Sequence, residues 1–410
     1  MNSKEMIELA NGYKDELIKI RRYLHKHPEV GFELTETKSF VKRKLEEMGY
    51  QVEEVGKSGL VVKVGGVKPG KVFLIRADMD ALPIKEEADV EFMSANGNMH
   101  ACGHDMHTTM LLGAAKLLKQ YENEIDGTIK LMFQPAEEIF EGSKDMIEHG
   151  VLENPHVDAA LMIHVTANLA LPEGTILVSA PGVSAPAADY FEIVVKGKGC
   201  HGSAPNNGID PINVAAHILI ALQEIHAREL SSSDNAVLTI GKIAGGSVPN
   251  VIPNTVSMEG SIRTYDEDTR SFLKDRIEGI SKGIANAFRS EVKINYGSGC
   301  PTLLNSTELS EEIECYVKEL LGENKAISVA KMHSKTKKSG KKSSSGAGSE
   351  DFAYISHDVP SIMLALAAGH PEKGYNYPQH HPKVKFDEDV LTSGSAVYAY
   401  TALRYLQEHK

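Results

Sequence analysis

Short apolar runs alternate with helical patterns along the first part of the chain and again near its end. Four of these runs are KVFLI (71–75), TIKLMF (128–133), DAALMI (158–163) and SIMLAL (361–366). Strands that are apolar along most of their length are buried on both faces, so helices must cover both sides of the sheet. We therefore expect an α/β fold with a mixed, mostly parallel sheet flanked by helices. An amphipathic helix from Met6 to Leu24 is expected to precede it.

The pattern changes between Pro186 and Ser298. There it reads strand, helix, strand, strand, helix, strand, which is the ferredoxin-like βαββαβ order. The sequence thus predicts one domain in two parts, 1–185 and 299–410, with a second domain inserted at 186–298. The six segments are DYFEIVVKG (189–197), PINVAAHILIALQEIHAR (211–228), NAVLTIGKI (235–243), NTVSMEGSIRT (254–264), EDTRSFLKDRIEGISKGIANAF (267–288) and EVKINY (291–296).

Charge and composition argue against several classes of partner. The net charge is −12 and the pI about 5.8, which disfavours nucleic acid and anionic membranes as partners. No stretch of about 18 apolar residues occurs, so no membrane span is expected. The opening residues MNSKEMIELA lack a long apolar stretch, so no signal peptide is expected. Cys102, Cys200, Cys300 and Cys315 are far apart, which indicates reduced thiols in a cytoplasmic protein.

One segment, KTKKSGKKSSSGAG (335–348), is basic and rich in serine and glycine. Such a composition cannot form a packed core, so it predicts a mobile surface loop. The alternative is a basic binding patch.

The stretch NMHACGHDMH (98–107) concentrates possible metal ligands. Cys102 and His104 are separated by one residue, and thiolate with imidazole suits zinc and similar borderline metals. Gly103 between them would let the backbone turn so that both face inward. The alternative is a buried thiol beside a surface histidine.

Other candidate ligands follow the apolar runs. The carboxyl ends of strands in α/β sheets are where ligands bind, so these side chains are expected to share one rim. PQHHPKVKFDED supplies His380 and His381 ahead of a final helix. The candidates after the strands are Asp78, Asp80, Glu137, Glu138 and His164.

Metal-dependent hydrolysis needs one carboxylate to hold the metal and another to move the proton of the attacking water. Glu137 and Glu138 are adjacent and could divide these tasks, because neighbours in an extended segment point opposite ways. The alternative for such a pair is a solvated turn.

Eight segments, in order, resemble one known family. They are RRYLHKHPEVGFE, RADMDALP, MHACGHDMHTTMLLGAA, QPAEE, GKGCHGSAPNNGIDP, PNVIPNTVSMEGSIRT, GSEDF and HHPKVKFDED. They are similar to the amidohydrolases that include hippurate hydrolase, N-acyl-amino-acid amidohydrolases and plant auxin-conjugate hydrolases. These belong to the wider aminoacylase and carboxypeptidase family of dinuclear metal hydrolases.

The resemblance implies two divalent metal ions per subunit: zinc, manganese, nickel or cobalt. Glu137 would be the general base and acid, and His201 would stabilise the tetrahedral oxyanion. Asn250 and Arg263 would line the substrate site. The family form of the last motif, His, a variable residue, then Pro, selects His380 rather than His381. The implied metal ligands are Cys102, His104, Glu138, His164 and His380.

The surrounding residues and the inserted domain have further implied roles. Asp78, Asp80 and Asp105 are expected to support the site, with direct ligation by Asp78 or Asp80 as the alternative. Glu350 and Asp351 of GSEDF would lie near it, without an assigned role. In the family the ferredoxin-like domain is a lid and dimerisation domain, so a homodimer or homotetramer is expected. Two features depart from the family. The basic segment stands where the family has a short link before GSEDF, which affects the expected shape of the nearby substrate pocket. Asn206 stands where many relatives carry histidine, which affects the expected substrate preference.

The expected activity is hydrolysis of the amide bond of a small N-acyl amino acid. Three alternatives stay open. The same metal site could serve a dipeptidase or carboxypeptidase. The protein could bind metal without catalysis, although Glu137 would then have no task. Cys102 could instead be a nucleophile with a paired histidine.

Overall fold

The computed structural model describes residues 2–336 and 348–410, which form two compact units. Within the described residues, the first unit comprises 2–184, 304–336 and 350–410, and the second comprises 185–303 with 348 and 349. The predicted mobile loop at 335–348 lies for the most part outside the described residues. Each unit has its own buried apolar cluster, so the two are described separately.

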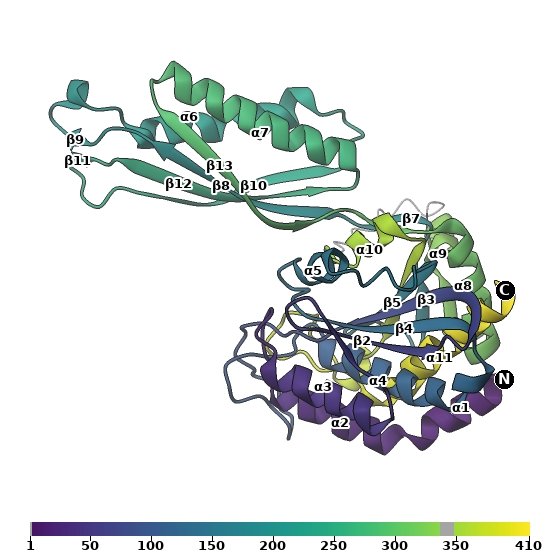
Figure 1. Ribbon diagram of the computed structural model, residues 1–410. Helices are drawn as coiled ribbons and strands as arrows, with labels where there is room; N and C mark the ends of the chain where they lie inside the picture. Colours follow the sequence, from purple (N-terminus) through teal and green to yellow (C-terminus); the bar gives the residue numbers. More distant parts are fainter. Residues whose placement is uncertain (1, 337–347) are drawn as a thin grey trace. The chain divides into compact units, whose positions relative to one another are not determined.

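The first unit is built on an eight-stranded sheet in the order β1-β2-β4-β3-β5-β16-β6-β15. Figure 1 labels β2, β4, β3 and β5 of this sheet. The pairs β4/β3, β3/β5, β5/β16 and β6/β15 are parallel, and β1/β2, β2/β4 and β16/β6 are antiparallel. The expected α/β class with a mixed, mostly parallel sheet is therefore confirmed. The strands are β1 (Glu53–Val55), β2 (Gly59–Gly65), β3 (Lys68–Asp78), β4 (Asp126–Gln134), β5 (Ala159–Thr166), β6 (Ile176–Val178), β15 (Ala326–Ser328) and β16 (Ser361–Ala367), with β7 (Gly182–Ala185) and β14 (Leu303–Asn305) in a separate two-stranded sheet.

Helices cover both faces of this sheet: α4 and α11 pack on one face, and α5 and α10 lie on the other (Figure 1). The single helix expected from Met6 to Leu24 is instead two, because Tyr13 leaves the helical region at φ −99° and ψ 1°. The helices of the unit are α1 (Ser3–Gly12), α2 (Lys14–Lys26), α3 (Thr35–Glu47), α4 (His104–Gln120), α5 (Gly142–Glu148), α8 (Thr307–Leu321), α9 (Val329–Thr336), α10 (Ala353–Asp358) and α11 (Leu391–Glu408).

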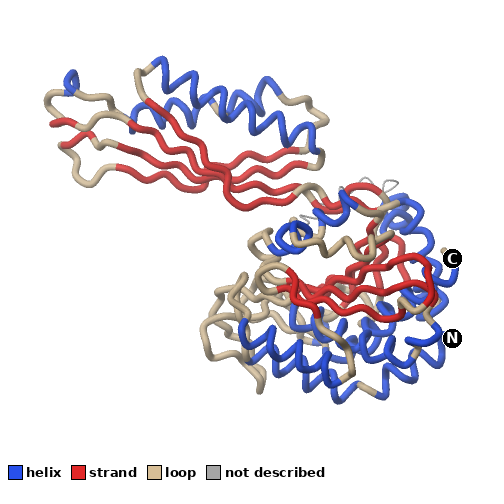
Figure 2. Tube along the Cα trace, in the orientation of Figure 1, coloured by secondary structure: helices blue, strands red, loops and turns tan. Residues whose placement is uncertain are grey.

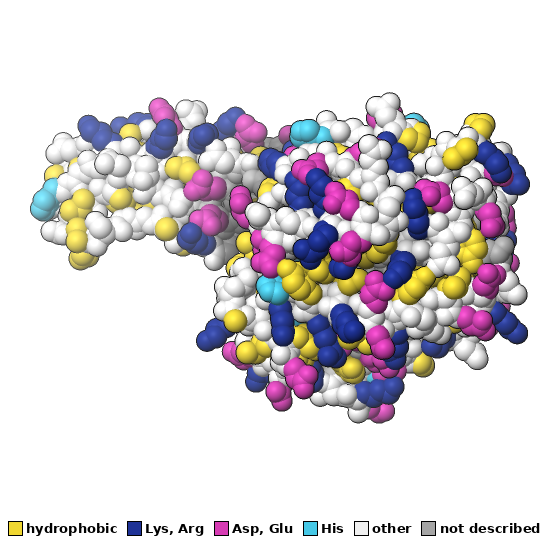
Figure 3. Space-filling model, turned by 60° about the horizontal axis from the view of Figure 1, so that its bottom comes forward, with side chains coloured by type: hydrophobic (Ala, Val, Ile, Leu, Met, Phe, Trp, Pro, Cys, Tyr) yellow, Lys and Arg dark blue, Asp and Glu magenta, His cyan; other side chains and the backbone are white. Residues whose placement is uncertain are grey.

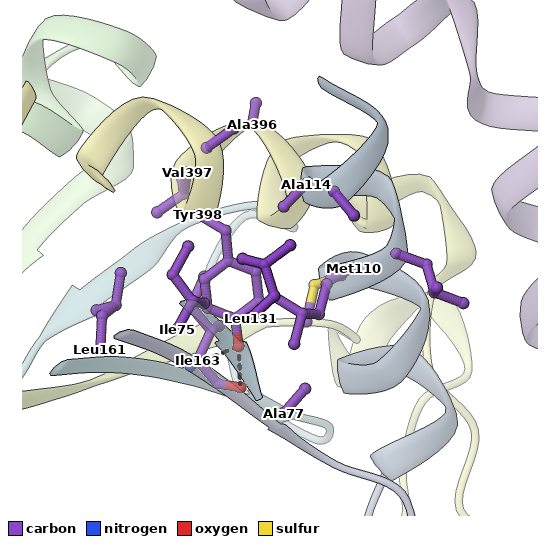
Figure 4. Close-up of a cluster of buried hydrophobic side chains, with 14 of the residues drawn as sticks. Ile75, Ala77, Met110, Ala114, Leu131, Leu161, Ile163, Ala396, Val397 and Tyr398 are labelled. Carbon is purple, nitrogen blue, oxygen red and sulfur yellow. Dashed lines mark hydrogen bonds between the residues drawn. The ribbon is translucent and has the colours of Figure 1, made fainter. Parts of the chain in front are cut away.

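Apolar side chains of β3, β4 and β5 pack against α4 and α11 in the core of the first unit (Figure 4). The buried hydroxyl of Tyr398, on α11, accepts a hydrogen bond from the Ile163 amide at 2.8 Å and donates to the Arg76 carbonyl at 3.3 Å. A buried tyrosine hydroxyl needs such partners. These hydrogen bonds connect β3 and β5 to α11. Ile163 directly precedes His164 in β5.

The second unit has a four-stranded antiparallel sheet in the order β10-β12-β8-β13. Two helices, α6 and α7, cover one face of this sheet (Figure 2). The helix expected at 211–228 ends at Ala221, and a single turn of π-helix follows at Ile225–Glu229. The elements are β8 (Ala187–Lys196), β9 (Cys200–His201), α6 (Pro211–Ala221), β10 (Ala236–Gly245), β11 (Val251–Ile252), β12 (Thr255–Thr264), α7 (Glu267–Ala287) and β13 (Glu291–Cys300).

The surface of the described residues mixes charges of both signs. On the face drawn in Figure 3, lysine and arginine side chains lie among aspartate and glutamate side chains. None of the described helices combines the length and the apolar character needed to cross a bilayer.

Candidate metal centre

The loop before α4 holds Cys102 and His104 on either side of Gly103. Gly103 has φ +93°, a left-handed conformation that glycine adopts without strain. A Cβ at this position would lie 2.5 Å from Cγ2 of Val165 and 3.0 Å from Cζ of Phe386. Only glycine therefore fits, and the tight turn brings both neighbouring side chains into the buried interior of the first unit.

Two histidines of the cluster are held in the same tautomer. The Nδ1–H of His104 donates to the Asp80 carbonyl at 2.9 Å, and that of His164 donates to the Val165 carbonyl at 2.7 Å. A proton on Nδ1 leaves the Nε2 lone pair free to bind a metal. Nε2 of His164 lies 3.5 Å from Sγ of Cys102. His164 lies within β5 rather than after the strand, close to its carboxyl end.

The two glutamates that follow β4 lie in a turn, not in an extended segment. Ala136 and Phe140, which flank them, have φ of +56° and +55°. The amides of Glu137 and Glu138 donate to the Asp80 carboxylate at 3.0 and 3.2 Å. The expectation that the side chains point opposite ways is wrong, because both carboxylates come within 3.9 Å of Nε2 of His104. Left-handed non-glycine residues are costly and are found where the surrounding structure enforces them.

His380 reaches the cluster from the loop before α11. It also has a left-handed backbone, with φ +63°, and its amide donates to the carbonyl of Ala101 at 2.9 Å. This bond attaches the loop to the segment that carries Cys102. Nε2 of His380 lies 3.5 Å from Oε1 of Glu138, and the side chain is 53 % exposed.

Six predicted residues thus meet in overlapping groups within the first unit. In each group the ligand atoms lie within 4.8 Å of one another. Their union contains the five predicted metal ligands and Glu137. The groups are Cys102 with His104 and His164, Cys102 with Glu138 and His380, and His104 with Glu137 and Glu138.

The chemistry of this cluster fits divalent cations. Among the described residues, no hydrogen-bond partner is found for buried Nε2 of His104 or Oε1 of Glu138. Burial, with the charges of Asp80 and Asp78, raises the pKa of Glu138 to about 7. Burial and the neighbouring Glu138 raise the pKa of the Cys102 thiol. A cation between these groups would supply the missing positive charge and favour their deprotonated forms, and sulfur, nitrogen and oxygen together suit zinc and its neighbours.

Asp78 supports the cluster through His107. Nδ1–H of His107 donates to Asp78 at 2.6 Å, and its Nε2 accepts from the Val165 amide at 2.9 Å. The imidazole therefore links β3 to the end of β5, next to His164. In the sequence, the position of His107 one helical turn after His104 allows this role without requiring it.

Asp105 holds the other side of the loop. Its carboxylate accepts from Nε of Arg21 at 2.8 Å, from Nδ1 of His25 at 2.8 Å and from the Met106 amide at 3.0 Å. Burial alone would raise the pKa of Asp105, but Arg21 and His25 outweigh burial and hold that pKa well below its usual range. His25 also forms a hydrogen bond with Glu86 at 3.0 Å. A buried charged network therefore supports the loop that carries Cys102 and His104.

We expect Asp105→Asn to weaken metal binding by about 10–100-fold, as for other residues that orient ligands. The amide keeps the shape of the side chain but loses the charge that holds Arg21 and His25. Competition with a chromogenic chelator measures the affinity. Asp89→Asn, which removes an exposed carboxylate of the same unit, is the control. Equal metal affinity for Asp105→Asn and wild type would contradict the supporting role.

The GSEDF segment joins the site through a fully buried guanidinium. Arg76 donates to Asp78 at 2.6 Å, to Glu350 at 2.9 Å and to Asp351 at 2.8 Å. Glu350 and Asp351 have carboxylate oxygens within 4.8 Å of one on Glu137. Sequence reasoning missed Arg76, although an arginine at the end of the apolar run KVFLIR was a usable signal.

The other predicted residues belong to the second unit. The pairing of β9 with β11 sets Val251 opposite His201, and the Gly202 amide donates to the Asn250 carbonyl at 2.8 Å. His201 and Asn250 are therefore neighbours. Arg263 is the second-last residue of β12. Its guanidinium donates to the hydroxyl of Tyr190 at 3.2 Å and to that of Ser349 at 2.9 Å.

Comparison with known proteins gives consistent matches over most of the chain. The sequence model of peptidase family M20/M25/M40 matches residues 74–404. N-acetylcysteine deacetylase of Bacillus subtilis is 35% identical over 398 residues, 96% of this chain and 98% of the relative. IAA-amino acid hydrolase ILR1-like 2 of Arabidopsis thaliana is 35% identical over 96% of this chain and 86% of the relative. Thermostable carboxypeptidase 2 of Saccharolobus solfataricus is 37% identical over 96% of each.

A solved structure is also similar. It is described as a dinuclear metal binding peptidase of the M20 family from Bacillus subtilis. The TM-score is 0.76 and the identity 32%, with 97% of this chain and 99% of that chain covered.

Proposed function

The chain belongs to peptidase family M20/M25/M40 and is a metal-dependent hydrolase, and we propose that its substrates are N-acyl amino acids. The scissile bond would be the amide between a small acyl group and the amino acid. The residues proposed to hold two divalent cations are Cys102, His104, Glu138, His164 and His380.

The names of two relatives, N-acetylcysteine deacetylase and IAA-amino acid hydrolase, support N-acyl amino acids as the substrates. The observation that carries the hydrolytic reaction is the placement of Glu137. Its side chain is buried, 6 % exposed, and its carboxylate lies 3.9 Å from Nε2 of His104. Its backbone is held by the Asp80 carboxylate, in a turn with strained neighbours. Burial, with the charges of Glu350 and Glu138, raises the pKa of Glu137. A carboxylate beside the ligand cluster, with an affinity for protons above that of a surface glutamate, suits proton transfer.

The bound cations would supply Lewis acidity toward the scissile carbonyl and the attacking water. Glu137 takes the proton of that water and returns it to the leaving amine. His201 donates a hydrogen bond to the oxyanion of the tetrahedral intermediate. Arg263 and Asn250 bind the substrate, for which a guanidinium suits the α-carboxylate of the amino acid.

The second candidate substrates are dipeptides or the carboxyl-terminal residues of peptides. The similarity to thermostable carboxypeptidase 2, at 37% identity, favours this candidate. Peptides and N-acyl amino acids share the amide and the carboxylate and differ in a free α-ammonium group. That ammonium would lie close to two divalent cations and be repelled by them.

We expect kcat/KM for N-acetyl-L-methionine to exceed that for glycyl-L-methionine by about tenfold or more, because of this repulsion. The two substrates differ only in the ammonium group of the glycine. N-benzoylglycine and further N-acyl amino acids then define the acyl preference. Faster hydrolysis of the dipeptide would favour a dipeptidase instead.

We also propose that the second unit mediates a homodimer or homotetramer and that the enzyme acts in the cytoplasm. Large apolar side chains on this unit support the first point. Val237 is 54 % exposed, Ile243 53 %, Val248 50 % and Val251 45 %. Sedimentation of the intact protein tests the oligomeric state.

A further inference from the structure

The turn after β9 holds the His201 ring at one nitrogen. Nδ1 of His201 lies 2.7 Å from the hydroxyl oxygen of Ser203 and 3.2 Å from the Ser203 amide nitrogen. Both groups come from one residue, two positions along the chain.

These contacts assign the proton of the neutral imidazole. A backbone N–H can only donate, so Nδ1 must accept and carries no proton. The proton of the neutral ring then resides on Nε2. With Nδ1 as an acceptor, the Ser203 hydroxyl donates a second and shorter hydrogen bond to it.

The turn itself is anchored to the neighbouring strand. The Gly202 amide donates to the Asn250 carbonyl at 2.8 Å, and the Ala204 amide donates to the His201 carbonyl at 2.9 Å. A Cβ at position 202 would lie 2.9 Å from the Asn250 oxygen, so the close approach requires glycine. The backbone around His201 is therefore fixed, and Ser203 fixes the ring on that backbone.

We propose that Ser203 is a positioning residue that makes His201 a hydrogen-bond donor at Nε2. The proposal rests on the proposed function, in which His201 donates to the oxyanion. In the other tautomer, Nε2 would present a lone pair to a negatively charged oxygen and repel it. Ser203 keeps the ring in the donating form and limits its rotation.

We expect Ser203→Ala to lower kcat by about threefold to tenfold with KM unchanged. One hydrogen bond of ordinary strength is lost, while the amide contact at 3.2 Å remains. The oxyanion exists only after the substrate is bound, so the loss falls on kcat. Removing the donor itself, in His201→Ala, should cost about 10²–10³-fold.

The experiment compares Ser203→Ala, Ser203→Thr and Ser290→Ala in the zinc-loaded, full-length enzyme. Threonine keeps the hydroxyl and should restore kcat. Ser290 donates a hydroxyl hydrogen bond of 2.7 Å to the Lys196 carbonyl, so its alanine variant is a control for the loss of one such bond. Long-range ¹H–¹⁵N spectra of histidine-labelled protein report which ring nitrogen is protonated, and His201→Gln identifies the signal.

The wild-type spectrum should show the proton on Nε2 of His201, and Ser203→Ala should shift the Nδ1 signal toward a tautomer mixture. A proton on Nδ1 in wild type, or identical spectra and kcat for wild type and Ser203→Ala, would overturn the proposal while leaving the proposed function intact. A shifted spectrum in Ser203→Ala, with kcat unchanged there and in His201→Ala, would instead refute the oxyanion role of His201 and with it the catalytic purpose of Ser203.

Discussion

Replacing Glu137 by glutamine is expected to lower kcat by about 10²–10⁴-fold, because the amide cannot take a proton from water. The substitution keeps the size of the side chain and the backbone bond to Asp80. KM and the amount of bound metal should change little, since Glu137 is not among the proposed metal ligands. Steady-state kinetics and elemental analysis of the same preparation measure both quantities.

Folding is not expected to suffer from this change. Glu137, Glu350 and Asp351 are three buried carboxylates with oxygens within 4.8 Å of one another. Removing one negative charge reduces their mutual repulsion, so the free energy of unfolding should stay equal or rise. A lower Tm for Glu137→Gln than for the wild type would therefore indicate a fault in the preparation and not an effect of the lost carboxylate.

Glu148→Gln, on the exposed side of α5, is the matched control and should retain wild-type kcat. If Glu137→Gln turned over substrate like the wild type, another group would be the base. If neither wild type nor variant hydrolysed any member of the substrate panel, the reading as a metal-binding protein without catalysis would gain support.

Removal of the metal is expected to abolish activity and to lower Tm. Without cations, half-buried Glu138 and buried Cys102 lose the positive charge that would favour their deprotonated forms, because burial keeps the pKa of each group raised. A ligand at 100 times its Kd stabilises a protein by about 2.7 kcal/mol, so the shift in Tm should be readily measured. Dialysis against a chelator followed by additions of zinc, manganese, nickel or cobalt measures recovery of both activity and Tm.

The same experiment separates two roles for Cys102. A thiolate that binds metal is not free to attack a carbonyl, so activity should depend on metal throughout. Activity that resists the chelator would contradict the metal centre and favour Cys102 as a nucleophile paired with a histidine. Enzyme mixed with chelator and an excess of metal controls for effects of the chelator itself.

Local chemistry was enough to predict much of the fold. The apolar runs at 71–75, 128–133, 158–163 and 361–366 lie in β3, β4, β5 and β16. The family resemblance is confirmed by the match over residues 74–404. The strand, helix, strand, strand, helix, strand order was readable between 186 and 298 because β8, α6, β10, β12, α7 and β13 are long, whereas β9 and β11 have only two residues each. The break between α1 and α2 at Tyr13 could not be predicted from the sequence, because the apolar spacing continues through it.

By itself the sequence determined the kinds of ligand, since thiolate, imidazole and carboxylate are properties of single residues. Only the tertiary structure decided how they are held. The left-handed turns at Ala136 and His380 depend on partners far along the chain, Asp80 for one and Ala101 for the other. The buried network of Arg21 and His25 with Asp105 joins residues about 80 positions apart. Such contacts form only when the sheet and helices have packed, so no local sequence pattern predicts them.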